Sequence, residues 1–195
     1  MKRLVLFLAL AVLAVPSLAR AQEEKRGMIN GKPYFEATDK VTETATVIKV
    51  DKKTRNVTLL DASGDTLVIE CGPEVKNFAQ IKVKDVVKAT YTETLTIMAE
   101  APGAPEVSHE TMAGAAELGQ KPSASVTERT QVKATITAID KTAGTATLKS
   151  MDGDEFVVTP KLPENLDKVA IGDLVTFTYT QSIAVSVEKV APKKK

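Results

Sequence analysis

Residues 45–68 read ATVIKVDKKTRNVTLLDASGDTLV, and residues 134–157 read ATITAIDKTAGTATLKSMDGDEFV. The two stretches share Ala-Thr, Asp-Lys, Thr-Leu and Gly-Asp steps at a constant spacing of 89 residues. The agreement then resumes at a spacing of 88 residues, where Thr90-Tyr91-Thr92 matches Thr178-Tyr179-Thr180. A repeat of this length exceeds one solenoid turn or propeller blade. The sequence therefore predicts a duplicated small module.

Apolar residues alternate with polar ones inside each copy of the module. This period of two, with many Thr and Val residues, is typical of half-buried β-strands. Turn signals separate the predicted strands, and Asp152-Gly153 is the strongest because Gly tolerates a positive φ. Pro73 and Leu162-Pro163 each open a predicted helical turn. A longer closing strand follows in each copy, with one parity formed by the residues Val87, Ala89, Tyr91, Leu95 and Ile97, or Val175, Phe177, Tyr179, Ile183 and Val185.

Three short strands, a helical turn and a long closing strand predict a small barrel of the OB-like or SH3-like class. The predicted fold is all-β, with two tandem five-stranded barrels at residues 41–98 and 126–190. Residues 22–40 are charged and lack a period, and we expect a flexible lead-in there. Residues 99–125 are rich in Ala, Gly, Pro, Ser and Glu, which predicts a flexible linker.

Both ends of the chain carry distinctive segments. Residues 1–21 combine Lys2-Arg3, a short apolar run and Ala19-Arg20-Ala21, the pattern of a cleaved signal peptide. The run is too short to cross a bilayer comfortably, so we expect a periplasmic or secreted protein with no integral membrane segment after cleavage. Residues 191–195 form a basic tail.

The charge and cysteine content restrict the function further. Removal of Lys2, Arg3 and Arg20 changes the formal charge from +1 to −2. A near-neutral surface argues against nucleic-acid binding, which needs a basic footprint. Cys71 is the single cysteine, so no intramolecular disulfide forms. Its place at a strand end predicts a buried, inert thiol.

The pattern in residues 132–190, with Ile139-Asp140, Thr147-Leu148 and Ile171-Gly172-Asp173-Leu174-Val175, resembles the periplasmic copper/silver efflux accessory proteins. The resemblance implies small five-stranded OB-type barrels in the periplasm. The metal site of that family needs a His, a Trp and a Met-x-Met pair. This chain has no Trp, and Met151 is its single candidate in the matching region. No metal ligand is therefore carried over from the family.

Few other residues suggest a metal site. His109 and Met112 lie in the predicted linker, and with Met98 and Met151 they are the candidate ligands for a soft metal. We expect no bound metal or cofactor, because a flexible segment does not pre-position ligands. The predicted hairpin tips carry several acidic residues: Asp61, Asp65, Asp152, Asp154 and Glu155. They favour turn formation, because calcium binding needs a longer run of oxygen ligands.

Two aromatic residues occupy equivalent places in the copies. Tyr91 and Tyr179 share the parity of the apolar residues of their strands. We therefore expect them to pack in the core or at the barrel rim rather than to form a stacking platform for bases or sugars.

The sequence carries no nucleophile elbow, phosphate loop or zinc-hydrolase motif. It therefore predicts a protein that is not an enzyme. We expect an exported binding protein whose two modules contact an envelope protein partner. Two alternatives remain open: a metal-handling accessory protein, and a small-ligand or glycan binder that uses the barrel mouths.

Overall fold

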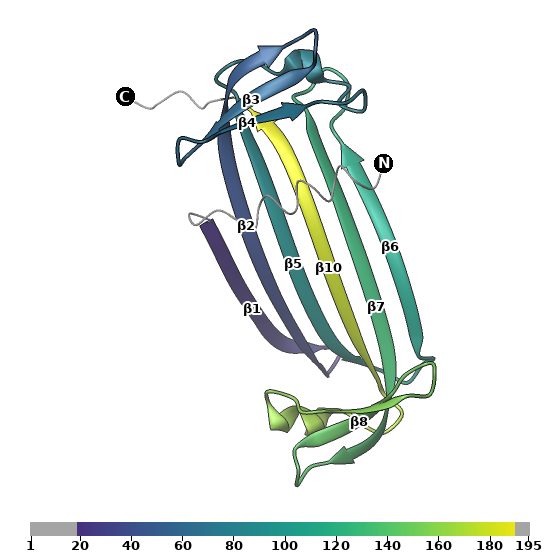
Figure 1. Cartoon of the computed structure of the whole chain (residues 1–195). Helices are drawn as coiled ribbons and strands as arrows, with labels where there is room; N and C mark the ends of the chain where they lie inside the picture. Colours follow the sequence, from purple (N-terminus) through teal and green to yellow (C-terminus); the bar gives the residue numbers. More distant parts are fainter. Residues whose placement is uncertain (1–18, 190–195) are drawn as a thin grey trace.

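The computed structural model describes residues 19–189, which form one ten-stranded antiparallel sheet and two short 3-10 helices (Figure 1). The all-β class is confirmed. The strands are β1 (Ala19–Ile29), β2 (Lys32–Asp51), β3 (Asn56–Asp61), β4 (Thr66–Glu70), β5 (Val86–Glu100), β6 (Glu106–Ala115), β7 (Ser123–Asp140), β8 (Thr145–Lys149), β9 (Glu155–Val158) and β10 (Leu174–Glu188), and the helices are η1 (Phe78–Gln80) and η2 (Pro163–Lys168). The predicted tail 191–195 and the predicted signal peptide 1–21, apart from its last three residues, lie outside the described residues.

The long strands β1, β2, β5, β10, β7 and β6 lie side by side in that order, and we call them the long sheet (Figure 1). The predicted closing strands are β5 and β10, which pair with each other along their whole length. In this register Glu93 faces Gln181. These two positions are also equivalent in the repeat, so an approximate two-fold axis passes through this pair.

A small cap closes each end of the long sheet. The first cap consists of β3, β4 and η1, and the second of β8, β9 and η2 (Figure 1). A β-bulge in β2 after Val47 and one in β7 after Ile136 mark the transition into the caps. Such bulges bend a strand and increase its twist. At both bulges the preceding residue donates its N–H across the turn, to Asp85 O or Asp173 O, at 2.8 Å.

The two closed barrels are not confirmed, because all ten strands belong to one sheet. The structure also differs from the predicted flexible segments. Residues 22–40 form most of β1 and the first part of β2, while residues 99–125 contain β6 and the start of β7. β6 is exposed along almost its entire length and is held by backbone pairing to β7. A strand without a buried face leaves no alternation in its sequence, which explains why composition indicated a linker.

Each repeat is linked to the cap of the other repeat by an ion pair. Lys32 at the start of β2 contacts Asp173, and its repeat equivalent Lys121 contacts Asp85. Both aspartate side chains are buried. Burial alone would raise the pKa of Asp173, but the Lys32 ammonium and the N–H of Ala170 outweigh it and hold this pKa below its ordinary value. The hairpins β1–β2 and β6–β7 are thus fixed to opposite caps.

Each cap has its own apolar core. The first core is formed by the buried residues Val47, Val57, Leu59, Phe78, Ile81 and Val187. The second has a smaller buried centre of Ala134, Ile136 and Leu148. Cys71 packs against the first core, and burial raises the pKa of its thiol. Cys71 is half-buried, and its inertness stays a prediction.

Candidate functional site: a pocket at the second cap

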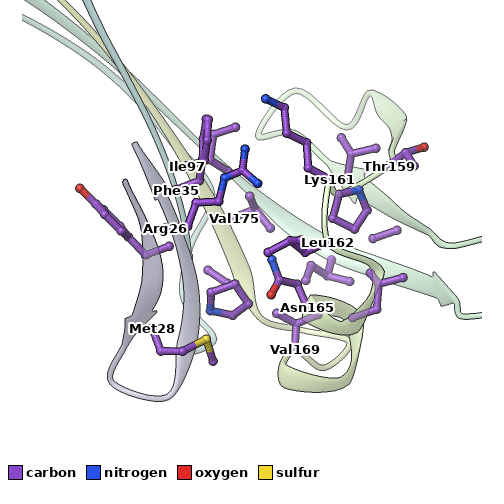
Figure 2. A pocket seen from close by; sticks show the side chains of 18 of the residues that line it. Arg26, Met28, Phe35, Ile97, Thr159, Lys161, Leu162, Asn165, Val169 and Val175 are labelled. Carbon is purple, nitrogen blue, oxygen red and sulfur yellow. The ribbon is translucent and has the colours of Figure 1, made fainter. Parts of the chain in front are cut away.

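A pocket of about 710 Å³ lies between the tip of the β1–β2 hairpin and the second cap (Figure 2). Most of its wall is apolar. Figure 2 shows Arg26 and Met28 on the hairpin facing Leu162 and Asn165 on the cap. The floor comes from the long sheet, through the side chains of Phe35, Ile97, Ala99, Val175 and Phe177.

The pocket exists because the second cap carries smaller side chains than the first at equivalent positions. In the first cap these positions are filled and buried. In the second cap the replacements line the pocket. The substitutions, written as first-cap residue and its repeat equivalent, are Val57 and Ala146, Phe78 and Leu166, Ile81 and Val169, and Val187 and Ala99. Protein interiors are close-packed, so this loss of volume leaves a hollow.

A further residue fills the first cap and has no counterpart in the second. The Arg55 guanidinium lies 4.6 Å from the centroid of the Phe78 ring and donates hydrogen bonds to the carbonyls of Cys71, Gly72 and Val75. Its repeat equivalent is Gly144, at a turn where both residues have a positive φ. The second cap therefore lacks this support, which contributes to its more open packing.

The hairpin tips also dock differently. At the first cap, Asn77 Nδ2 donates to Glu117 O at 2.7 Å, and Gly119 N donates to Asn77 Oδ1 at 3.2 Å. Asn165 is the repeat equivalent at the second cap, and its side chain lines the pocket. Among the described residues its side-chain amide has no hydrogen-bond partner. Asn77 thus gives the β6–β7 tip a second attachment to its cap, whereas the β1–β2 tip, held by the Lys32–Asp173 pair, leaves a gap beside Asn165.

These two asparagines form a matched pair for mutation. Asn77→Ala should lower the free energy of unfolding by about 1–3 kcal/mol, because it leaves the Gly119 N–H without its partner and removes one of the two hydrogen bonds to Glu117 O beside a buried side chain. Asn165→Ala should cost less than about 0.5 kcal/mol, since its amide makes no such bond. Urea denaturation followed by circular dichroism measures both. Equal losses in the two variants would contradict the asymmetric docking of the hairpins.

Charged side chains meet at the mouth of the pocket. Arg26 Nη2 donates to Glu24 Oε2 at 2.5 Å, and Lys161 Nζ lies 3.5 Å from Glu24 Oε1. Both cations also lie against Phe35: Arg26 Cζ is 5.4 Å and Lys161 Nζ is 5.2 Å from its ring centroid. The hydrogen bond from Arg26 holds the pKa of Glu24 below its ordinary value.

The equivalent place at the other end of the long sheet is a hollow of about 350 Å³ lined by small residues. Ala115, Ser123 and Ala124 lie there. Their repeat equivalents at the pocket are Arg26, Tyr34 and Phe35. The two ends of the protein have the same backbone topology, but large side chains line the pocket where small ones line the hollow.

The structure does not bring the predicted metal candidates together. His109 and Met112 lie on β6 at positions of opposite parity, and His109 Nδ1 is 3.0 Å from Thr130 Oγ1. Met98 lies on β5, which β10 and β7 separate from β6. Met151 lies in the turn between β8 and β9. Within residues 19–189 there is no group of three His, Cys, Asp or Glu side chains that could hold a metal ion.

Tyr91 and Tyr179 differ from the predicted packing role. Both hydroxyls donate to Glu93 Oε1, at 2.5 Å and 2.9 Å, and Gln181 Nε2 donates to both hydroxyls. Burial, together with the bond to Glu93, raises the pKa of Tyr91. The cluster lies on the two-fold axis of the open long sheet, where Tyr179 is 40% exposed. Because the sheet does not close into barrels, no barrel core receives these rings.

The acidic hairpin tips behave as predicted for Asp61, whose Oδ1 accepts the N–H groups of Ser63 and Asp65 at 2.8 and 2.9 Å. In the second cap, Ser150 Oγ accepts the N–H of Asp154 at 3.1 Å. These contacts are turn chemistry of the Asx and Ser type.

None of the helices in the described part of the chain has the length and apolar character needed to span a bilayer. Comparisons with known protein families, with curated proteins and with solved structures find no match to this chain. The resemblance to copper/silver efflux accessory proteins therefore stays a prediction. The pocket at the second cap, which sequence reasoning did not identify, is the candidate functional site.

Proposed function

We propose that this protein is a non-enzymatic binding protein that holds an apolar small molecule in the pocket at the second cap. The observation that carries the proposal is the asymmetry of the two ends. A duplicated fold filled one cap with Val57, Phe78 and Val187 and left a hollow at the other. A volume of about 710 Å³ is within the range of about 300–1,000 Å³ that is usual for ligand pockets.

The chemistry of the wall indicates the ligand. Ile97, Val175 and Phe177 provide an apolar floor, and the polar side chains in the lining are few. Ligand sites commonly combine an apolar wall with a small number of placed polar groups. Such a wall favours an apolar molecule over a glycan, which needs many hydrogen-bond partners.

Several sequence-based predictions accompany this proposal. Export to the periplasm or beyond rests on residues 1–21, and the absence of enzymatic activity rests on the lack of catalytic motifs. An envelope protein partner and metal handling stay predictions, as does the likeness of each half to an OB-type barrel. The pocket favours the small-ligand alternative among the three predicted functions.

The pocket can be filled with the residues that already fill the first cap. We expect the neutral dye N-phenyl-1-naphthylamine to bind the wild-type chain with a blue-shifted, enhanced emission. Ala99→Val combined with Ala146→Val should weaken this binding at least about tenfold, because the added methyl groups occupy the pocket. The reverse pair at the first cap, Val57→Ala with Val187→Ala, should leave dye binding unchanged.

Thermal melting of both double variants establishes that they fold. Filling the pocket should leave the melting temperature unchanged or raise it, since filling a cavity commonly stabilises a protein. Unchanged dye binding in a folded Ala99→Val, Ala146→Val variant would contradict the proposal. So would a wild-type chain that does not enhance the emission of the dye.

A further inference from the structure

We infer that the ligand of this pocket carries an anionic group, and that Arg26 and Lys161 bind this group at the mouth. The inference rests on the proposed function and names the class of ligand: an apolar molecule that ends in a carboxylate. It follows from the charges in the wall, from their position relative to the apolar floor, and from the difference between the two repeats.

The charges that line the pocket have one sign. Its lining residues include two cations, Arg26 and Lys161, and no Asp or Glu. Glu24 lies behind the wall and pairs with both cations. One carboxylate against two cations leaves a net positive charge at the mouth. A ligand carboxylate would neutralise that charge and would gain charge-assisted hydrogen bonds from either cation.

The alternation of β1 separates this group from its charged neighbours. Lys25 has the opposite parity to Glu24 and Arg26, so its side chain emerges on the other face of the long sheet. There it pairs with Glu36 at 3.3 Å and Glu23 at 3.4 Å. Lys25 therefore does not contribute to the pocket, although it is adjacent to Arg26 in sequence. This makes it a suitable control for charge changes.

The cations lie at the border between the apolar floor and solvent. Both are close to the Phe35 ring, which lies beside Ile97 on the sheet. A cation held against an aromatic face stays near apolar surface while its charge reaches water. The Asn165 amide, without a hydrogen-bond partner among the described residues, adds a donor on the opposite wall (Figure 2). An apolar chain on Ile97 and Val175 would place its head group between these donors.

The first cap supports the assignment by contrast. Ala115 is the repeat equivalent of Arg26, and Ala124 is that of Phe35. The hollow that they line has neither a cation nor an aromatic ring among its residues. The charged mouth thus occurs together with the enlarged pocket and is lacking where the cap is filled.

The test uses three ligands that share a chain and differ in the head group. Dodecanoate, dodecanol and dodecyltrimethylammonium, each below its micellar concentration, compete with the neutral dye on the full chain. We expect dodecanoate to bind about three- to tenfold more tightly than dodecanol, and the cationic ligand to bind most weakly. The effect is modest because Lys161 and Arg26 are 66% and 39% exposed, so solvent screens them. The preference should decrease as salt is raised.

Variants that remove positive or negative charge at the mouth should change dodecanoate affinity in opposite directions. Arg26→Gln combined with Lys161→Gln should abolish the preference for dodecanoate over dodecanol. Glu24→Gln should tighten dodecanoate binding about two- to threefold, because it removes the competing carboxylate. Lys25→Gln removes one positive charge on the other face and should change nothing.

The outcomes separate the two proposals. Equal affinities for dodecanoate and dodecanol, with no effect of the charge variants, would overturn the anionic head group while the apolar pocket stands. A chain that binds neither the dye nor dodecanol would remove the proposed function itself. A loss of dodecanoate binding in Lys25→Gln that is as large per charge removed as in the double variant would assign the preference to overall charge and overturn the inference.

Discussion

Replacing Leu148 with alanine should lower the free energy of unfolding of the whole chain by about 3 kcal/mol. Leu148 is fully buried in the second core, where it packs with Ala134 and Ile136. The sheet cannot move inward to fill the space left by this side chain, because Ala134 and Ile136 both lie on β7, which is paired with a strand on each side. The loss therefore combines the transfer of the side chain to water with the cavity that remains.

The matched variant is Leu59→Ala, at the equivalent position of the first core. Urea denaturation followed by far-ultraviolet circular dichroism should show one transition for the wild type and for both variants. Each variant should shift the midpoint of that same transition, since β2, β5, β10 and β7 join the two caps in one sheet. Two transitions, with each variant shifting a different one, would instead support two independently folding barrels.

Lys32→Met should lower the free energy of unfolding at pH 7 by about 3 kcal/mol. The variant keeps an apolar side chain of similar length but removes the ammonium that contacts the buried carboxylate of Asp173. Only the N–H of Ala170, at 2.8 Å, then still supports this charge among the described contacts. An uncompensated buried carboxylate is costly because it has lost its hydration.

The stability deficit of Lys32→Met should depend on pH, and the pKa of Asp173 gives the direction of the change. In the wild type the folded-state pKa of Asp173 is lowered, so the ion pair stabilises the protein fully above the unfolded-state value of about 3.9. That contribution is lost as the pH falls through the lower folded-state pKa. In Lys32→Met, burial without the ammonium raises the pKa of Asp173, so protonation relieves the penalty. The deficit of the variant should therefore shrink between pH 7 and pH 4.

Denaturation at both pH values measures this change. Lys121→Met provides the comparison at the other end, where Asp85 is buried against it, and its cost at pH 7 should be similar. The double variant Lys32→Met, Asp173→Asn should recover part of the stability, because no charge is then buried. A deficit of equal size at pH 7 and pH 4 would show that Lys32 acts through packing of its aliphatic chain.

The sequence predicted the strands in which apolar and polar residues alternate. The alternation around Val87 and Val175 located β5 and β10, and Pro163 located η2. β1 and β6 were missed because their pairing depends on backbone hydrogen bonds, which leave no hydrophobic period. The pairing of β5 with β10 was also not predictable from either repeat alone, since closing a barrel and joining two halves satisfy the same alternating pattern.

The pocket left a signal in the sequence that depends on comparing the copies position by position. Ala99 in place of Val187, and Ala146 in place of Val57, are conservative changes when each is considered alone. Together they remove volume from one place in the fold. A second signal is Lys32-Pro33, which recurs as Lys121-Pro122 at the spacing of 89 residues. It extends the repeat into the segments that composition assigned to a lead-in and a linker.

The reciprocal links Lys32–Asp173 and Lys121–Asp85 mean that neither half of the chain is complete alone. A polypeptide with residues 19–100 would have an open β5 edge and an ammonium separated from its carboxylate. In a symmetric homodimer, a second copy of that polypeptide would pair with the open β5 edge and would supply the carboxylate for the ammonium. The present chain has the architecture of such a homodimer fused into one molecule. In a symmetric homodimer both ends would be identical. In the fused chain the two ends can differ, so one cap has a filled core while the other contains a pocket.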